Sequence, residues 1–167
     1  VVLDEKETGG SLHDKLAEAG ARLCVETLKG LEAHAITPEK QGESPTEYAR
    51  MLDKSLGKID WTRPAEEIER LIRGLNPWPS AYTDWTGKTM KIWEAQVINQ
   101  EEAKAAQQEA AKPGTVVKVE KDGFLVQTGK DLLKVCALQI PGKKRMDAGA
   151  FLRGYTMEAG VELGSEE

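Results

Sequence analysis

The first long pattern in the chain is helical. Apolar residues recur every three to five positions and so share one helix face, namely Leu12, Leu16, Ala19, Leu23, Leu28 and Leu31. With Ser11 as the expected cap after a break at Gly9-Gly10, the pattern predicts a helix over 11–33. Val1-Val2-Leu3 resembles the end of a strand. An amphipathic helix needs a sheet against its apolar face, so we expect that sheet upstream, in a longer protein of which this chain is a piece.

Two shorter helices are predicted next. Ser44-Pro45-Thr46-Glu47 offers a cap, a Pro at the first helical position and a Glu that can reach back to the cap, which predicts a helix over 45–54. Arg63-Pro64 begins another helix, which ends near Gly74 and buries Ile68, Leu71, Ile72 and Leu75. Between them, 54–61 is expected to be an exposed linker with a basic edge.

From Asn76 onward the pattern is extended. Asn76-Pro77-Trp78-Pro79 predicts a rigid hinge, because proline lacks an amide donor and pushes the preceding residue out of helical geometry. Alternating runs separated by turn residues then predict five strands, over 80–86, 89–98, 115–120, 124–128 and 131–140. Five short strands indicate a small β-barrel. The run 99–112 is expected to be an exposed loop or frayed helix, and a last short helix is predicted over 147–153.

The charge of the chain is unevenly distributed. Its 167 residues carry a net charge of −5, which as an average argues against a nucleic-acid partner. Residues 112–153, however, hold nine Lys and Arg against four Asp and Glu, a local charge of +5. This stretch includes the run Lys143-Lys144-Arg145. Because electrostatic fields act locally, a polyanion can bind there.

Several classes of chemistry find no support in the residues. No apolar run has the length of a membrane span or the form of a signal peptide, so we expect a cytoplasmic protein. Cys24 and Cys136 lack a C-x-x-C partner and are expected to be reduced thiols. The chain has no phosphate-binding loop, dinucleotide fingerprint, zinc-protease motif or serine elbow. His13, in a first helical turn, and His34, just past a helix end, are poor catalytic candidates.

Four segments carry a resemblance to a known family. They are Thr8-Gly9-Gly10-Ser11-Leu12-His13-Asp14-Lys15-Leu16, Lys58-Ile59-Asp60-Trp61, Ile72-Arg73-Gly74-Leu75-Asn76-Pro77-Trp78-Pro79 and Leu138-Gln139-Ile140-Pro141-Gly142-Lys143-Lys144-Arg145-Met146. Their sequence and order resemble the second half of the methionyl-tRNA formyltransferase family, over almost the whole chain. The Ile-Asp-Trp and Asn-Pro-Trp-Pro elements are shared with other formyltransferases, whereas the two lysines after Pro-Gly are more particular to the tRNA enzyme. The chain begins after the region that holds the family's catalytic Asn, His and Asp and its Ser-Leu-Leu-Pro loop, so no catalytic residue is assigned.

The resemblance implies an α+β fold in three parts. Residues 1–36 would be the helical tail of a Rossmann-like formyltransferase domain, 37–75 a helical connector, and 76–167 a C-terminal domain with a small barrel like the oligonucleotide-binding fold. In this family the whole enzyme transfers a formyl group from 10-formyltetrahydrofolate to the amino group of methionyl initiator tRNA, at the start of protein synthesis. The barrel and connector are expected to hold the tRNA. By itself the chain is expected to be an inactive monomer that binds no cofactor or metal.

The expected tRNA contacts are basic side chains, because Lys and Arg bind phosphates without reading bases. The first candidates are Lys143, Lys144 and Arg145, followed on the connector by Lys54 and Lys58. Weaker candidates are Lys118, Lys121, Lys130 and Lys134. The alternative for each of these side chains is a solvated surface charge. The four tryptophans are expected in the core or at an interface rather than stacked on bases, with Trp61 and Trp78 joining connector to barrel and Trp93 inside a strand.

Two other functions remain open on the residues alone. The chain can be the tail of a related enzyme, such as a formyltetrahydrofolate hydrolase or a sugar-amine formyltransferase, in which the barrel shapes the substrate cleft and binds no RNA. It can also be a stand-alone RNA-binding module. The basic stretch 112–153 favours the tRNA enzyme over the first alternative, and the uncovered apolar stripe of the first helix argues against the second.

Overall fold

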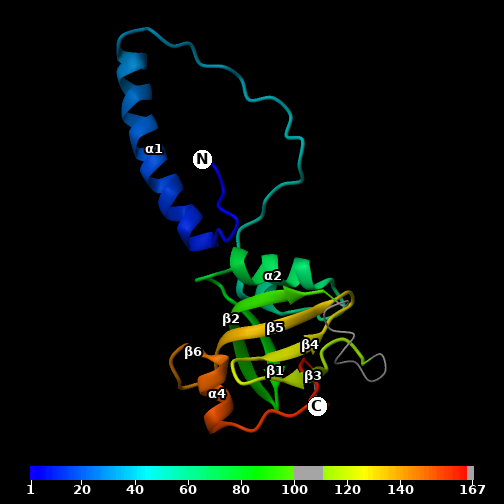
Figure 1. The fold of residues 1–167 in the computed structure, drawn as a ribbon. Helices are drawn as coiled ribbons and strands as arrows, with labels where there is room; N and C mark the ends of the chain where they lie inside the picture. The colour runs from blue at the N-terminus through cyan, green and yellow to red at the C-terminus, as the bar shows by residue number, and fades with distance from the viewer. Residues whose placement is uncertain (100–110, 165–167) are drawn as a thin grey trace.

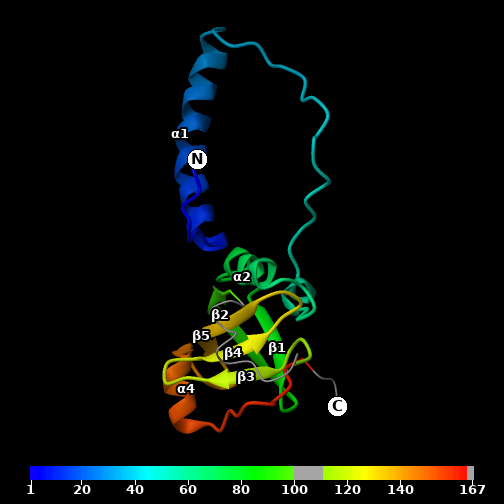
Figure 2. The same ribbon diagram turned by 45° about the vertical axis from the view of Figure 1, so that its right-hand side comes forward.

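A long helix and an extended segment stand on a sheet domain (Figures 1 and 2). The computed structural model describes residues 1–99 and 111–164 of the chain. Helix α1 (Gly9–Glu32) rises away from the sheet, and residues 33–53 return without regular structure to the 3₁₀ turn η1 (Lys54–Gly57). Helix α2 (Ala65–Gly74) then lies between α1 and the sheet in both views.

Helix α1 confirms the predicted helix but begins earlier. Thr8 is the N-cap: the Ser11 amide donates to Thr8 Oγ1 at 3.1 Å, and the Thr8 amide donates to Ser11 Oγ at 3.0 Å. Such a reciprocal pair satisfies two amides that the first turn leaves free. The expectations that Ser11 is the cap and that Gly9-Gly10 breaks the chain were therefore wrong. As expected, the apolar stripe is uncovered: no residue of α1 is buried.

The predicted helix over 45–54 was wrong. Residues 45–53 contain no helix, and the Ser44 hydroxyl instead accepts a hydrogen bond from the Thr46 amide at 3.3 Å. The large apolar residues of this segment, Tyr48, Met51 and Leu52, are exposed. A helix of this length needs tertiary packing to persist in water, and a good cap cannot replace it.

The segment from Lys54 to Trp61 was expected to be a linker, and this too was wrong. Ile59 and Trp61 are buried in the same apolar core as the sheet, and Trp61 Nε1 donates to Thr83 Oγ1 at 3.0 Å. Helix α2 follows, as predicted, and buries Ala65, Ile68 and Ile72. The core of the domain therefore begins before α2, within the stretch that looked like a tether.

All five predicted strands are present. They are β1 (Ala81–Trp85), β2 (Lys88–Ile98), β3 (Val116–Val119), β4 (Phe124–Gln127) and β5 (Leu132–Gln139). A two-residue strand, β6 (Met146–Asp147), pairs with β5, and α4 (Ala148–Gly154) confirms the predicted last helix. The strands are antiparallel in the order β1-β2-β5-β4-β3. Most of the predicted loop 99–112 lies outside the described residues.

The described strands form an open sheet rather than the closed barrel that we expected. Strands β1 and β3 lie at its two ends and do not pair with each other. Between them runs the segment 160–164, whose Leu163 amide donates to the Gly114 carbonyl at 2.8 Å, before β3, and whose Gly164 amide donates to the Asp84 carbonyl of β1 at 2.9 Å. This irregular segment satisfies edge groups that a closing strand would otherwise pair.

The hinge at 76–79 connects α2 to β1. Its two proline bonds, after Asn76 and after Trp78, are cis. Trp78 is 55% exposed, so the expectation that it joins connector to barrel was wrong, whereas the same expectation for Trp61 is confirmed by its burial. Trp85 is also buried, with its ring 5.1 Å from that of Phe151 in an edge-to-face contact.

Candidate nucleic-acid interface

One row of residues crosses the outer face of the sheet. Lys58 forms a bridge with Tyr82 of β1, Tyr82 is paired with Lys91 of β2, and Lys91 is paired with Gln139 of β5. Paired residues share a face, and the neighbours of Lys91, Met90 and Ile92, are buried on the opposite one. We call Lys58, Tyr82, Lys91 and Gln139 the outer row. At about 4.8 Å per strand it is roughly 14 Å long.

A rigid turn places the main basic cluster at one end of this row. The Lys143 amide donates to the Ile140 carbonyl at 3.1 Å, and Gly142 adopts φ +74°, which fits a type II turn with Pro141 at its second position. Gln139 Nε2 donates to the Lys143 carbonyl at 2.8 Å and ties the turn to the outer row. We call residues 140–145 the basic turn. Among the described residues, the exposed side chains of Lys143 and Lys144 have no ion-pair partner.

Arg145 ends the basic turn in a different environment. Its guanidinium lies 5.6 Å from the ring centre of Trp93 and 3.6 Å from Glu94. Trp93 is the extra residue of a β-bulge, because Ile92 pairs with Leu138 and Glu94 with Ala137. Bulges re-aim side chains. The indole N–H of Trp93 donates to Gln139 Oε1 at 3.2 Å, so the ring is held beside the outer row.

The two connector candidates lie close together along the chain. Lys58 belongs to the outer row, and exposed Lys54 begins the 3₁₀ turn that leads into it. Asp53 caps that turn by accepting the Ser55 amide at 2.7 Å. Hydrogen bonds from the Ser55 side chain and amide lower the pKa of Asp53. The structure therefore brings Lys58 onto the face that also carries the basic turn.

Two of the weaker candidates are engaged in an internal ion network. Lys134 lies 3.0 Å from Glu120 and 2.9 Å from Asp122, while Lys118 lies 2.8 Å from Glu120. Hydrogen bonds from Lys118 and then Lys134 lower the pKa of Glu120. Each lysine is thus neutralised by a neighbour. Because Glu120 and Asp122 are already subtracted in the +5 of residues 112–153, that net charge rests on the other basic side chains of the stretch.

A groove of about 700 Å³ adjoins Arg145 and Trp93. The N-terminal segment, α2 and β2 form its walls through Glu5, Lys6, Thr8, Glu69, Arg73, Asn76 and residues 93–97. Arg73 links two of these walls: its Nε donates to Glu69 at 2.6 Å and its Nη1 to the Glu7 carbonyl at 2.8 Å. The groove is therefore formed where the N-terminal segment, α2 and β2, which are far apart in sequence, meet.

A hydrogen-bonded cluster holds the N-terminal segment beside α2. The Glu7 carboxylate, 7% exposed, accepts from Lys15, Ser11 and the Asp4 amide. These bonds, that from Lys15 first, lower the pKa of Glu7 to about 2. The Gly10 amide donates to the Asn76 carbonyl at 2.8 Å. We call this cluster, with the Arg73 bond, the N-terminal joint.

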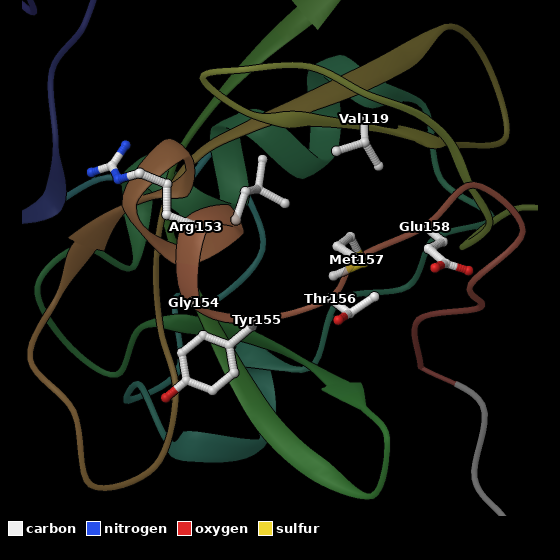
Figure 3. A pocket seen from close by; sticks show the side chains of 8 residues that line it. Val119, Arg153, Gly154, Tyr155, Thr156, Met157 and Glu158 are labelled. Atoms are coloured by element: carbon white, nitrogen blue, oxygen red, sulfur yellow. The ribbon is translucent and has the colours of Figure 1, made fainter.

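A second hollow, of about 450 Å³, lies beside α4 (Figure 3). Residues 152–158 and Val119 line it. The side chains of Arg153, Tyr155 and Glu158 point in three different directions, so they do not converge on one ligand (Figure 3). Tyr155 instead stacks on Phe151, with ring centres 5.0 Å apart. This hollow offers no set of converging polar groups such as binding sites use.

Sequence reasoning missed Lys91, Arg73 and the placement of Trp93. A signal existed for the first: Lys91 alternates with buried Met90 and Ile92, which places it on the polar face of a strand. The same alternation puts Trp93 on that face, whereas no local signal marks the bulge at Trp93, because the bulge arises from the pairing of β2 with β5.

Comparison with known proteins shows which family this sequence belongs to. Residues 51–156 match the family described as formyl transferase, C-terminal domain. The chain belongs to the formyl transferase C-terminal domain family. It is 55% identical to a methionyl-tRNA formyltransferase of Lachnospira eligens over 98% of this chain, and 49% identical to that of Agathobacter rectalis over 96%. The chain spans about half the length of these relatives, 51% and 49% respectively.

Solved structures support the family fold at lower similarity. A crystal structure of HypX from Aquifex aeolicus in complex with tetrahydrofolic acid aligns with a TM-score of 0.59 and 16% identity. It covers 98% of this chain and 30% of that protein. At this identity the likeness concerns the fold alone. Among the described residues of this chain, no helix is long and apolar enough to span a membrane.

Proposed function

We propose that this chain is the C-terminal half of a methionyl-tRNA formyltransferase and that its outer row and basic turn hold the tRNA backbone. The whole enzyme would move a formyl group from 10-formyltetrahydrofolate to the amino group of methionyl initiator tRNA. The relatives of that name support this assignment. The catalytic residues and the folate site would lie outside this chain, which alone would be inactive.

The observation that carries the tRNA role is the joining of two basic segments on one face. Lys58 and the basic turn are far apart in sequence, yet the register of β1, β2 and β5 aligns them with Lys91. Cations along a face of roughly 14 Å can contact successive phosphates, which position an RNA without reading its sequence. The ion-paired Lys118 and Lys134 would add little.

The domain division follows the same proposal. Residues 1–36 would be the tail of a Rossmann-like domain, which suits the exposed apolar stripe of α1, with 37–75 as connector and 76–167 as the C-terminal domain. Because Ile59, Trp61 and α2 share the core of the sheet, the connector would orient the tRNA face relative to the catalytic half.

Salt-dependent binding of methionyl initiator tRNA tests the role of the basic turn. The double variant Lys143→Ala, Lys144→Ala should weaken binding and lower the slope of log affinity against log salt by about 1 to 2, since each phosphate contact contributes about 0.7 to 0.9. Lys29→Ala, in the exposed helix α1 outside the connector and the sheet domain, is the matched control and should change neither quantity. Undetectable binding at low salt, or an unchanged slope in the double variant, would reject the tRNA role and favour a related hydrolase or sugar-amine enzyme.

A further inference from the structure

We propose that the groove beside Trp93 holds an unpaired nucleotide of the bound RNA, with its base stacked on the Trp93 ring. This inference rests on the proposed tRNA role but names a different element of the RNA. The basic turn would hold phosphates of any RNA, paired or not. The groove would recognise only a nucleotide that is free of a duplex.

Trp93 has the geometry of a stacking platform. It is half-buried, it shares the outer face with Lys91 and Gln139, and the bond from its N–H to Gln139 fixes its edge. The Arg145 guanidinium and the Lys91 ammonium lie over this ring, 5.6 and 5.8 Å from its centre, so a base would displace one of them or stack on the Arg145 plane. Aromatic rings and Arg planes are the surfaces on which unpaired RNA bases stack.

The size of the groove selects for a single strand. Its volume of about 700 Å³ lies within the range of about 300–1,000 Å³ typical of small-ligand sites. A nucleotide or two fits such a space, whereas an RNA duplex does not. The duplex would remain outside, along the outer row.

The ion-paired side chains inside the groove can hydrogen-bond a base, and the unpaired cations beside the groove can bind a phosphate. Inside, Glu69 is paired with Arg73 and Glu94 with Arg145, so cations are balanced by carboxylates that can accept hydrogen bonds from base amino groups. Immediately outside, Lys143 and Lys144 have no such partners among the described residues. A nucleotide whose base enters the groove would place its phosphates near the basic turn.

Two RNA hairpins that differ only in an unpaired end test this proposal. One is blunt, and the other carries four unpaired nucleotides at its 3′ end. In anisotropy titrations the wild-type chain should bind the tailed hairpin more tightly. Trp93→Leu should weaken binding of the tailed hairpin about tenfold, the loss expected for one base stack, and leave the blunt hairpin unchanged. Trp78→Leu, which removes an exposed indole outside the groove, is the matched control and should change neither.

A second variant separates stacking from charge and from folding. Arg145→Lys keeps the positive charge but loses the planar group, so it should weaken the tailed hairpin more than the blunt one. A 2-aminopurine in the tail should lose fluorescence on binding to the wild type and much less with Trp93→Leu, whose fold is checked by circular dichroism.

The outcomes distinguish the two proposals. Equal affinity of the wild type for both hairpins, or equal losses for both in Trp93→Leu and Arg145→Lys, would overturn the stacking site and leave the phosphate role standing. Absence of binding to either hairpin at low salt, or blunt-hairpin affinity that survives Lys143→Ala, Lys144→Ala, would reject the phosphate role.

Discussion

Helices α1 and α2 both carry an amphipathic pattern, which is stronger in α2, and they differ in burial. The 24 residues of α1 bury none of their side chains, while the 10 residues of α2 bury three. A helix of α1's length can persist through its own hydrogen bonds and its capping box, whereas one of α2's length is marginal in water without tertiary packing. The pattern therefore predicts a helix in both cases, but burial alone decides which helix belongs to the core.

Truncation of one apolar residue in each helix tests this difference most strongly. Ile72→Ala in α2 should lower the free energy of unfolding by about 2–5 kcal/mol, because it leaves a cavity in a packed core. Leu23→Ala in α1, where the side chain is 63% exposed, should change it by about 0.5 kcal/mol or less. Urea unfolding measures both. Similar losses in the two variants would show that α1 is part of the same cooperative unit.

Alanine substitution at two glycines of α1 should have smaller effects on the stability of this helix and its contact with α2, and the two effects should have opposite signs. A Cβ at Gly9 would lie 2.3 Å from the Gly74 carbonyl oxygen, so Gly9→Ala should force α1 away from α2 and speed exchange of the Gly10 amide. At Gly20 a Cβ meets nothing within 4 Å, so Gly20→Ala should stabilise the helix by about 0.5–1 kcal/mol and raise its circular-dichroism signal. If Gly9→Ala leaves the exchange rate of the Gly10 amide unchanged, the hydrogen bond from Gly10 to Asn76 does not depend on the close approach of α1 to α2.

The N-terminal joint should respond to acid. Hydrogen bonds from Lys15 and Ser11 lower the pKa of Glu7 from 4.5 to about 2. Because the folded value lies below the ordinary one, the contribution of this carboxylate is complete above about pH 4.5 and is lost as the pH falls toward 2. The Gly10 amide should lose protection over that interval, measured as its exchange rate relative to the intrinsic rate at each pH, which itself falls in acid. Glu7→Gln removes the titrating group, so a pH dependence that persists in this variant would assign the effect to another carboxyl.

Much of the sheet domain could be predicted from the sequence because its signals are local. The alternation of β2, with Met90 and Ile92 on one face and Lys91 on the other, determines both its secondary structure and its orientation. The turn before β6 was equally visible, since Pro141-Gly142 has the residues that a type II turn requires.

The errors share one cause, which is the dependence of an element on distant partners. A good cap at Ser44 did not produce a helix, because Tyr48 and Met51 find no apolar surface. Ile59 and Trp61 looked like parts of a linker because the sheet that buries them is formed some 20 to 80 residues later. Of the candidate site, the basic turn was visible as a run of charge, but the outer row and the bulge at Trp93 depend on strand register.

The N-terminal joint also closes residues 10–73 into a long loop whose two ends are hydrogen-bonded to the same region. The Gly10 amide bonds to the Asn76 carbonyl and Arg73 bonds to the Glu7 carbonyl, so the path out along α1 and back through 33–53 starts and finishes at one place (Figure 1). Loop-closure entropy grows only by about 0.6 kcal/mol for each doubling of loop length. Residues 38–48 are exposed and thus offer a graft point, where a fluorescent reporter domain could be spliced in at little cost to the fold.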